Sequence, residues 1–327
     1  MVAASDNPLL TIGLPVFNGE NFLTEALESI LGQTFQDFEL VISDNASTDG
    51  TEAICRSYCE RDARVRYIRH AENRGAGANF NDLPGLARGR YFKWAAHDDV
   101  LDPQFLEKCI AFLEGNPAAT LCFSLVKAID ADGNTLKLVD RNLRNIGSSN
   151  PAKRFSDIAV EHHACFEVFG VIRTEALRRT DLHLPFRGSD RALLAELALL
   201  GPMGYLQEPL FHSRDHIERF THQVLMEGES VLKWYDPHIE TRAKQQQLAL
   251  FRQYLRMIRG HVVDHRVRLQ CYAVMLRCLL QGQNFRPLLG EILLTVSPRL
   301  YKVTRQAWHK IFGSNLKKQT ESLLDRS

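Results

Sequence analysis

The sequence predicts an α/β fold, with a mostly parallel sheet flanked by helices and an α-helical C-terminal extension. In the first half, short apolar runs alternate with segments whose apolar residues recur at helical spacing. Such alternation implies parallel strands joined by right-handed crossovers. After about Thr221 the composition is typical of helices, rich in Glu, Gln, Leu and Arg. We therefore expect an α/β domain over residues 1–222 and, over 223–327, a helical extension with a role in membrane association or homo-oligomer formation.

The first hundred residues contain four expected strands, each a short apolar or β-branched run. They are Leu9–Leu14, Phe38–Ser43, Val65–Arg69 and Tyr91–Ala95. Helices are expected between them, at the helical spacing of Phe22, Ala26, Leu27 and Ile30 and over Thr51–Tyr58 and Gly77–Leu86. A helix around Pro103–Leu113 then leads to a strand at Thr120–Leu125. Together these strands and helices form the expected parallel sheet and its crossovers.

From Ala128 to about Ser156 the periodic pattern weakens. Asp132-Gly133-Asn134 predicts a tight turn and Asn145–Pro151 a loop. Regular signal returns at Phe166–Arg173, followed by a helix around Asp190–Leu200.

Composition excludes several classes of protein. A formal net charge of +1 gives no global attraction to nucleic acid. No apolar run approaches the roughly 18 residues of a transmembrane helix, and the N-terminus lacks the pattern of a signal peptide. The seven cysteines contain no CxxC pair, which is typical of a reduced, cytoplasmic protein.

Polar clusters follow each of the four predicted strands. They are Pro15–Glu20, Asp44–Thr51, Asn73–Asn79 and His97–Asp99. Any one of them could be ordinary turn chemistry. Together they fall at one edge of one sheet, which is where α/β proteins bind nucleotides.

Asp98 and Asp99 end an apolar run that begins at Tyr91. Two adjacent carboxylates at the carboxyl edge of a sheet are suited to binding a hard divalent cation, which in turn binds a phosphorylated substrate. A dinucleotide fingerprint is excluded, because Phe80 stands where the third glycine after Gly75 and Gly77 is required. These glycines instead let the backbone approach a ligand, with Arg74 offering charge to phosphate.

The four motifs, in this order and spacing, resemble a family 2 glycosyltransferase with the GT-A fold over about residues 8–220. The motif residues are Pro15-Val16-Phe17-Asn18, Asp44–Thr51, Asn73-Arg74-Gly75 and Asp98-Asp99-x-x-x-Pro103. The resemblance implies transfer of a sugar, with inversion, from a UDP- or dTDP-linked donor to a glycan or lipid-linked acceptor. It also implies polysaccharide biosynthesis at the cell envelope, with acceptor loops mainly in Ala128–Arg187.

The resemblance further implies the residues of the site. The nucleotide-sugar site would comprise Pro15, Phe17, Asn18, Glu20, Asp44, Asn73, Arg74, Gly75, Asp98 and Arg214. In it Asp44 would accept a hydrogen bond from the base. A Mg²⁺ or Mn²⁺ ion would be held by Asp98, Asp99 and His216 and would neutralise charge on the leaving diphosphate. Ala96 replaces an acid that is common in relatives, which leaves open whether Asp98 or Asp99 is the direct ligand.

Inverting transfer needs a general base, and Asp190 is the candidate. It stands at a predicted helix start after Gly188, where relatives place their catalytic carboxylate. A helix N-cap is the alternative role, and Ser189 stands where many relatives have Glu. The pair His162-His163 is assigned to a loop or the acceptor pocket.

The segment Arg299–Lys318 has six basic residues and no acid, with apolar residues on one helical face. It resembles a basic amphipathic helix that lies on an anionic membrane, here the inner face of the plasma membrane. A core-packing helix with a solvated basic face is the alternative.

Three other classes of protein stay open. A nucleotidyltransferase would carry a basic glycine-rich loop after its first strand, and Pro15–Glu20 has neither Arg nor Lys. A non-catalytic nucleotide-sugar binding module is suggested by Ala96 and Ser189, and donor hydrolysis would separate it from an enzyme. A helical partner protein fits the C-terminal third alone.

Overall fold

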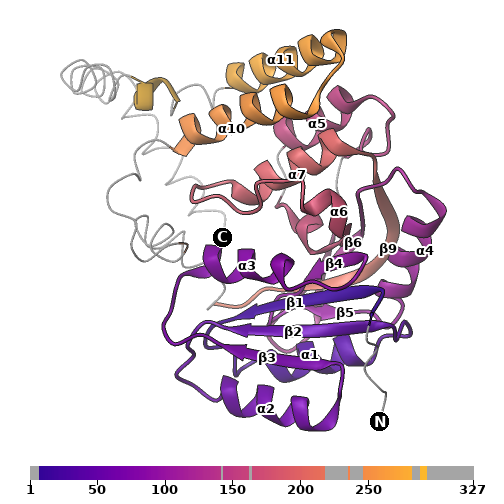
Figure 1. Cartoon of the computed structure of the whole chain (residues 1–327), viewed down its shortest axis with the longest axis vertical. Coiled ribbons are helices and arrows are strands. Elements are labelled where there is room, and N and C mark those ends of the chain that lie inside the picture. Colours follow the sequence, from indigo (N-terminus) through magenta and orange to yellow (C-terminus); the bar gives the residue numbers. More distant parts are fainter. Residues whose placement is uncertain are drawn as a thin grey trace.

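The computed structural model of the chain describes residues 7–140, 143–161, 164–217, 235, 246–281 and 288–292. Within these residues a nine-stranded sheet has helices on both faces (Figure 1). The elements are β1 (Leu10–Val16), α1 (Leu23–Leu31), β2 (Phe38–Asp44), α2 (Thr51–Arg61), β3 (Val65–Arg69), α3 (Ala76–Gly85), β4 (Tyr91–Trp94), β5 (Val100–Leu101), α4 (Phe105–Gly115), β6 (Leu121–Ile129), β7 (Thr135–Val139), α5 (Pro151–Val160), the 3-10 helix η1 (Phe166–Phe169), β8 (Val171–Arg173), α6 (Thr174–Leu177), α7 (Ser189–Leu200), β9 (Met203–Arg214), α10 (Gln246–His261) and α11 (His265–Leu280).

The first four strands form the parallel half of the sheet, in the order β3-β2-β1-β4. These are the four strands that the sequence predicts, and their ends agree within a residue or two. Val16 at the end of β1 is in register with Asp44 of β2, and Asp44 with Arg69 of β3. The polar clusters that follow these strands therefore begin side by side at the carboxyl edge of the sheet.

The other half of the sheet is mixed. β8 runs antiparallel to both β4 and β6, β9 runs parallel to β6, and the short β5 pairs antiparallel with β9. Because β5 follows Asp99 directly, its pairing with β9 brings the end of β9 back to the acidic pair, with Val100 opposite His212.

Two layers of helices bury the two faces of the sheet. Leu10, Ile12 and Leu14 of β1 pack in a cluster that includes residues of α1, α2 and α4. Phe92 and Trp94 of β4 belong to a second cluster with α5, α7, α10 and α11. The side chain of Trp94 is fully buried.

The C-terminal helices lie above this second face, with α11 furthest from the sheet in Figure 1. α10 packs on α7, and α11 packs on α5 and α10. Tyr254 of α10 contacts Phe155 of α5 edge to face, with ring centroids 5.2 Å apart. The helices expected after Thr221 are confirmed in the described residues of this region. The domain boundary at residue 222 stays a prediction.

Several predicted features lie outside the described residues. These are the basic segment Arg299–Lys318 and the pair His162-His163. Among the helices that are described, none is both long enough and apolar enough to cross a membrane.

Candidate active site

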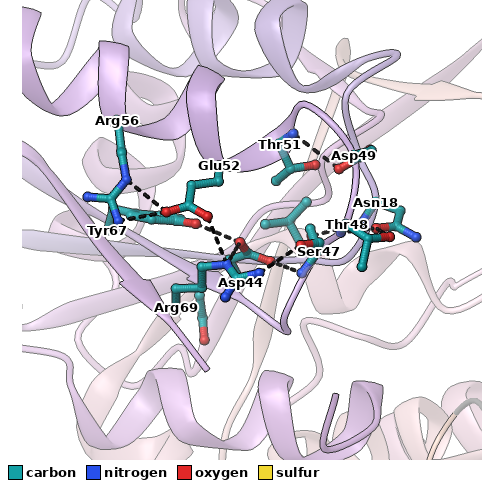
Figure 2. A network of polar contacts seen from close by, with 12 residues as sticks. Asn18, Asp44, Ser47, Thr48, Asp49, Thr51, Glu52, Arg56, Tyr67 and Arg69 are labelled. Carbon is teal, nitrogen blue, oxygen red and sulfur yellow. Dashed lines mark hydrogen bonds and ion pairs between the residues drawn. The ribbon is translucent and has the colours of Figure 1, made fainter. Parts of the chain in front are cut away.

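Two loops at the carboxyl edge of the sheet are tied together by backbone-to-side-chain hydrogen bonds. Asn18 takes a left-handed conformation, with φ 50°. Its backbone N–H donates to Ser47 Oγ at 2.9 Å, and its side-chain Oδ1 accepts from the Thr48 N–H at 2.9 Å (Figure 2). The loops after β1 and β2 therefore form one rigid unit.

Glu20 extends this unit to the start of α2. Its Oε2 accepts the Gly50 N–H at 2.6 Å, and its own N–H donates to Asp49 Oδ2 at 3.1 Å. The predicted site residue Glu20 thus shapes the loop that precedes α2.

Asp44 is fully buried at the end of β2. Its Oδ1 accepts the Ser47 N–H at 2.8 Å, and its Oδ2 accepts the Tyr67 hydroxyl at 2.6 Å, with Arg69 Nε at 3.5 Å. Burial, together with the hydrogen bond to Asp44, raises the pKa of the Tyr67 phenol well above its ordinary value. The carboxylate is therefore fixed in place beside the loop unit (Figure 2).

Pro15 and Phe17 differ in exposure. Pro15 is inside β1, in register with Ser43, and is buried. Phe17 lies just beyond the strand, and 42% of the residue is exposed. An exposed aromatic residue just beyond the strand is suited to stacking on a planar ligand.

The third cluster is built around Asn73. Its Oδ1 accepts from Asn45 Nδ2 at 2.8 Å and from the Gly75 N–H at 2.9 Å. Gly75 has φ 84°, a conformation that favours glycine, and is the residue before α3. The half-exposed Arg74 pairs with Asp82 at 2.6 Å. These contacts connect the third cluster to the second through Asn45.

Asp98 and Asp99 lie in the loop between β4 and β5, and both are largely buried. The end of β9 holds them. Asp99 Oδ1 accepts the Arg214 backbone N–H at 3.0 Å, and the Asp98 carbonyl accepts from Arg214 Nε at 2.9 Å. Asp98 Oδ2 faces His216 Nε2 at 3.0 Å. The structure therefore joins four residues that the sequence selected separately.

Arg214 has only 1% of its side chain exposed. Its Nη1 donates to the carbonyls of Asp130 and Ala131, at 3.2 and 2.8 Å, and its guanidinium lies over the Phe22 ring. Arg214 therefore links the loop that carries Asp98 to the turn that contains Asp130 and Ala131. Its predicted contact with a diphosphate stays a prediction.

A divalent cation fits the acidic loop as a partly protein-bound ion. Among the described residues no group of three or more His, Cys, Asp or Glu side chains is arranged to hold a metal. Asp98 Oδ2 and His216 Nε2 lie close together and can both act as metal ligands. The Asp99 carboxylate instead accepts the Arg214 backbone N–H. Mg²⁺ is commonly held by one or two carboxylates and takes its other ligands from water and substrate phosphates. These ligand atoms therefore suit a divalent cation whose remaining ligands come from a diphosphate.

Asp190 lies in the first turn of α7, and 55% of its side chain is exposed. The N-cap of this helix is Gly188, so Asp190 is not the N-cap residue. Its Oδ1 lies 3.1 Å from Nδ1 of His183, which is buried. The neighbouring Ser189 hydroxyl accepts the Leu184 N–H at 2.7 Å. Asp190 is thus a partly exposed carboxylate on a fixed support.

Sequence reasoning did not select Tyr67 and His183. Tyr67 could have been selected, because side chains alternate along a strand and Tyr67 therefore lies on the same face as Arg69, two residues further along. His183 carries no local signal, since its pairing with Asp190 depends on the path of the loop between them.

With this geometry in hand, the chain can be compared with known proteins. Its sequence matches the family described as Glycosyl transferase family 2 over residues 11–179, just over half of its length. The chain belongs to this family.

Two relatives are uncharacterized glycosyltransferases. One, from Methanocaldococcus jannaschii, is 37% identical over 139 residues, which is 42% of this chain and 48% of that protein. Another, from Rickettsia prowazekii, is 25% identical over 245 residues, 75% of this chain and 76% of that protein. The chain spans about half the length of the archaeal relative.

A solved structure of Staphylococcus aureus TarS, residues 1–349 with UDP, matches with a TM-score of 0.60 and 16% identity. The match covers 89% of this chain and 81% of that one. The chain therefore has the GT-A fold that the sequence predicts.

Proposed function

We propose that this chain is an inverting glycosyltransferase that moves a sugar from a UDP- or dTDP-linked donor to a glycan or lipid-linked acceptor. The observation that carries the proposal is the exposed carboxylate of Asp190 on a fixed support, in a family 2 chain with ordered motif loops. TarS has been solved with UDP and with UDP-GlcNAc, which supports a UDP-sugar as the first donor to test.

On the donor side, the linked loops after β1, β2 and β3 are suited to a nucleotide. Phe17 is exposed for stacking on the base, and Asp44 is held by the Tyr67 hydroxyl at the end of β2. Asn18 and Glu20 hold the loops in shape, while Asn73 and Gly75 hold the turn from which Arg74 projects. Preformed loops reduce the ordering cost of binding.

Asp98 and His216 would hold a Mg²⁺ or Mn²⁺ ion, with Asp99 and Arg214 keeping the loop in position. When bound, the ion supplies charge neutralisation at the leaving diphosphate. The protein's own part is to bring Asp98 Oδ2, on the loop between β4 and β5, within 3.0 Å of Nε2 of His216, which follows β9.

On the acceptor side, Asp190 takes the proton of the attacking hydroxyl as the new glycosidic bond forms at the anomeric carbon. The bond to the diphosphate breaks at the same carbon, which inverts its configuration. General base catalysis contributes about 10²–10⁴-fold to rate. The half-exposed side chain of Asp190 is compatible with access by an acceptor.

The first test is the variant Asp190→Asn. We expect kcat for sugar transfer to fall by at least about 100-fold, because the amide cannot accept the proton. Calorimetry with UDP should give a Kd within about twofold of wild type, since the donor loops are unchanged. A thermal-shift screen of nucleotide sugars with Mn²⁺ would first identify the donor.

The matched control for this test is Glu175→Gln, an exposed acid on α6. It should retain wild-type turnover. If Asp190→Asn also retains wild-type turnover, Asp190 is not the base.

The second test concerns the cation. In wild type we expect Mn²⁺ to tighten UDP binding by at least about tenfold, equivalent to about 1.4 kcal/mol. Asp98→Asn should abolish this dependence, because one of the two converging donors is lost. Asp132→Asn, in an exposed turn, is the control. Equal UDP affinity of wild-type protein with and without Mn²⁺ would remove the metal from the proposal.

The other classes predict different outcomes. A non-catalytic binding module would bind UDP-sugar without ever hydrolysing it, and a nucleotidyltransferase would release pyrophosphate from a nucleoside triphosphate. Slow release of UDP from UDP-sugar in the presence of Mn²⁺ supports the transferase. The cytoplasmic location and the membrane contact of Arg299–Lys318 stay predictions.

A further inference from the structure

We propose that His183 is a positioning residue for Asp190, and that its imidazole orients the carboxylate for proton transfer. The inference rests on the proposed function, because it assigns a partner to the base of that reaction. Its starting observation is the 3.1 Å contact between His183 Nδ1 and Asp190 Oδ1.

The His183 ring is held rigidly. Only 4% of its side chain is exposed, and it packs edge to face against Phe80 and Trp94 at centroid distances of 5.4 and 5.0 Å. Its backbone is fixed as well, since its N–H donates to Asn81 Oδ1 at 3.0 Å and its carbonyl accepts from Asn81 Nδ2 at 2.8 Å. A ring held this tightly can define the direction of a hydrogen bond.

The two ring nitrogens of His183 have different surroundings. Among the residues that the structure describes, Nε2 is buried without a hydrogen-bond partner, whereas Nδ1 lies 3.1 Å from Asp190 Oδ1. A buried N–H without an acceptor would carry a desolvation penalty. A proton on Nδ1 avoids this penalty, and Nδ1 is the ring nitrogen that lies within ion-pair distance of Asp190 Oδ1. This leaves the other carboxylate oxygen, Oδ2, for the acceptor hydroxyl.

The same contacts tie the base to the donor side. Asn81 belongs to α3, which begins just after Asn73 and Gly75. Asn79 of the same helix accepts the Ser43 hydroxyl at 2.5 Å and donates to the Ser43 carbonyl at 2.9 Å, next to Asp44. α3 is thus a rigid connection between the nucleotide loops and His183. It fixes where Asp190 stands relative to the donor.

A near-isosteric pair of variants separates positioning from packing. His183→Asn and His183→Leu both remove the ring, but the Asn amide can still donate to Asp190. Because the loss of the ring is shared, the ratio of their kcat values reports the polar contact with Asp190. We expect kcat of the Leu variant to lie roughly 10- to 100-fold below that of the Asn variant, part of the base's total contribution. UDP Kd should agree within about twofold.

Two further variants complete the experiment. His183→Phe keeps the aromatic packing against Phe80 and Trp94 and lacks the donor, so it should fold and show the same loss of kcat as Leu. His261→Phe is the matched control, because His261 pairs with Glu196 of the same helix at 2.7 Å, away from Asp190. It should lower the melting temperature and leave kcat unchanged.

The outcomes distinguish the two levels of the proposal. Equal kcat for His183→Asn, His183→Leu and His183→Phe, with Asp190→Asn inactive, would overturn the positioning role alone. Full turnover of Asp190→Asn would overturn the proposed base, whatever His183 does. In the Asp190→Asn background, His183→Leu should cause no further loss of donor hydrolysis, and an additional loss would mean that His183 acts elsewhere.

Discussion

Lys93 is a fully buried lysine in β4, on the strand that leads to the acidic loop. Its Nζ donates to the carbonyls of Trp94 and Phe169, at 3.0 and 2.5 Å. It also lies 4.9 Å from the Phe105 ring centroid. Burial lowers the pKa of Lys93 to about 7, although Cys109 and Asp99 act in the opposite direction. A group of this kind makes stability depend on pH.

The sign of that dependence follows from proton counts. Between pH 7 and 10.5 the unfolded chain keeps the proton on Lys93 while the folded protein loses it, so stability rises with pH. At about 1.36 kcal/mol per pKa unit, wild type should gain about 2 kcal/mol between pH 7 and 9. Lys93→Met should lack this gain. Urea unfolding of both proteins at pH 6, 7, 8 and 9 measures it, and parallel pH profiles would contradict it.

At the scale of elements, the sequence predicts the parallel half of the sheet well. β1, β2 and β4 are short runs with clear ends, and burial on both faces keeps their signal strong. β7 was missed, because Leu136 and Leu138 are exposed and no core imposes a pattern. α5 was also missed, although a helix-start signal was present. Asn150 caps the helix through the Ala152 N–H at 2.8 Å, with Pro151 next to it.

β9 explains why the site was only partly predictable. Its central Gln207-Glu208-Pro209 is exposed, and its pairing with β6 shifts register near Ser124, so no regular alternation appears in the sequence. Its end nevertheless delivers Arg214 to the acidic loop. Asp98, Asp99 and Asp190 were selected as candidates from motifs and from their order along the chain. The bracing by Arg214 and the support by His183 depend on long-range packing, which spacing does not encode.

At the scale of the whole molecule, the segment that carries Asp190 is held from two sides. α3 contacts it through Asn81, and α10 contacts it from the C-terminal side. Asp181 accepts from Gln253 at 2.6 Å and from Arg256 at 3.0 Å. Arg187 donates its N–H to Gln246 Oε1 at 2.5 Å. The C-terminal helices thus support the loop before the base and also complete the core over α5 and α7.

Removal of residues 223–327 should therefore destabilise the α/β domain itself. The deletion would uncover the apolar faces of α5 and α7 that Phe251, Tyr254, Met257 and Ile258 now cover. Full burial of one such side chain contributes about 1.5–3 kcal/mol, so the loss of four is comparable to the stability of a typical domain. We expect an aggregated or unfolded product by circular dichroism and gel filtration, without transferase activity.

Deletion of residues 293–327 alone is the matched comparison, because it keeps α10 and α11. If its melting temperature equals that of the full chain, the effect of the longer deletion is assigned to residues 223–292, which include the two helices. A soluble 1–222 fragment that melts at the full-chain temperature would show that the α/β domain folds alone. In that case the contacts from Asp181 and Arg187 to α10 would not be what holds the base-bearing segment in place.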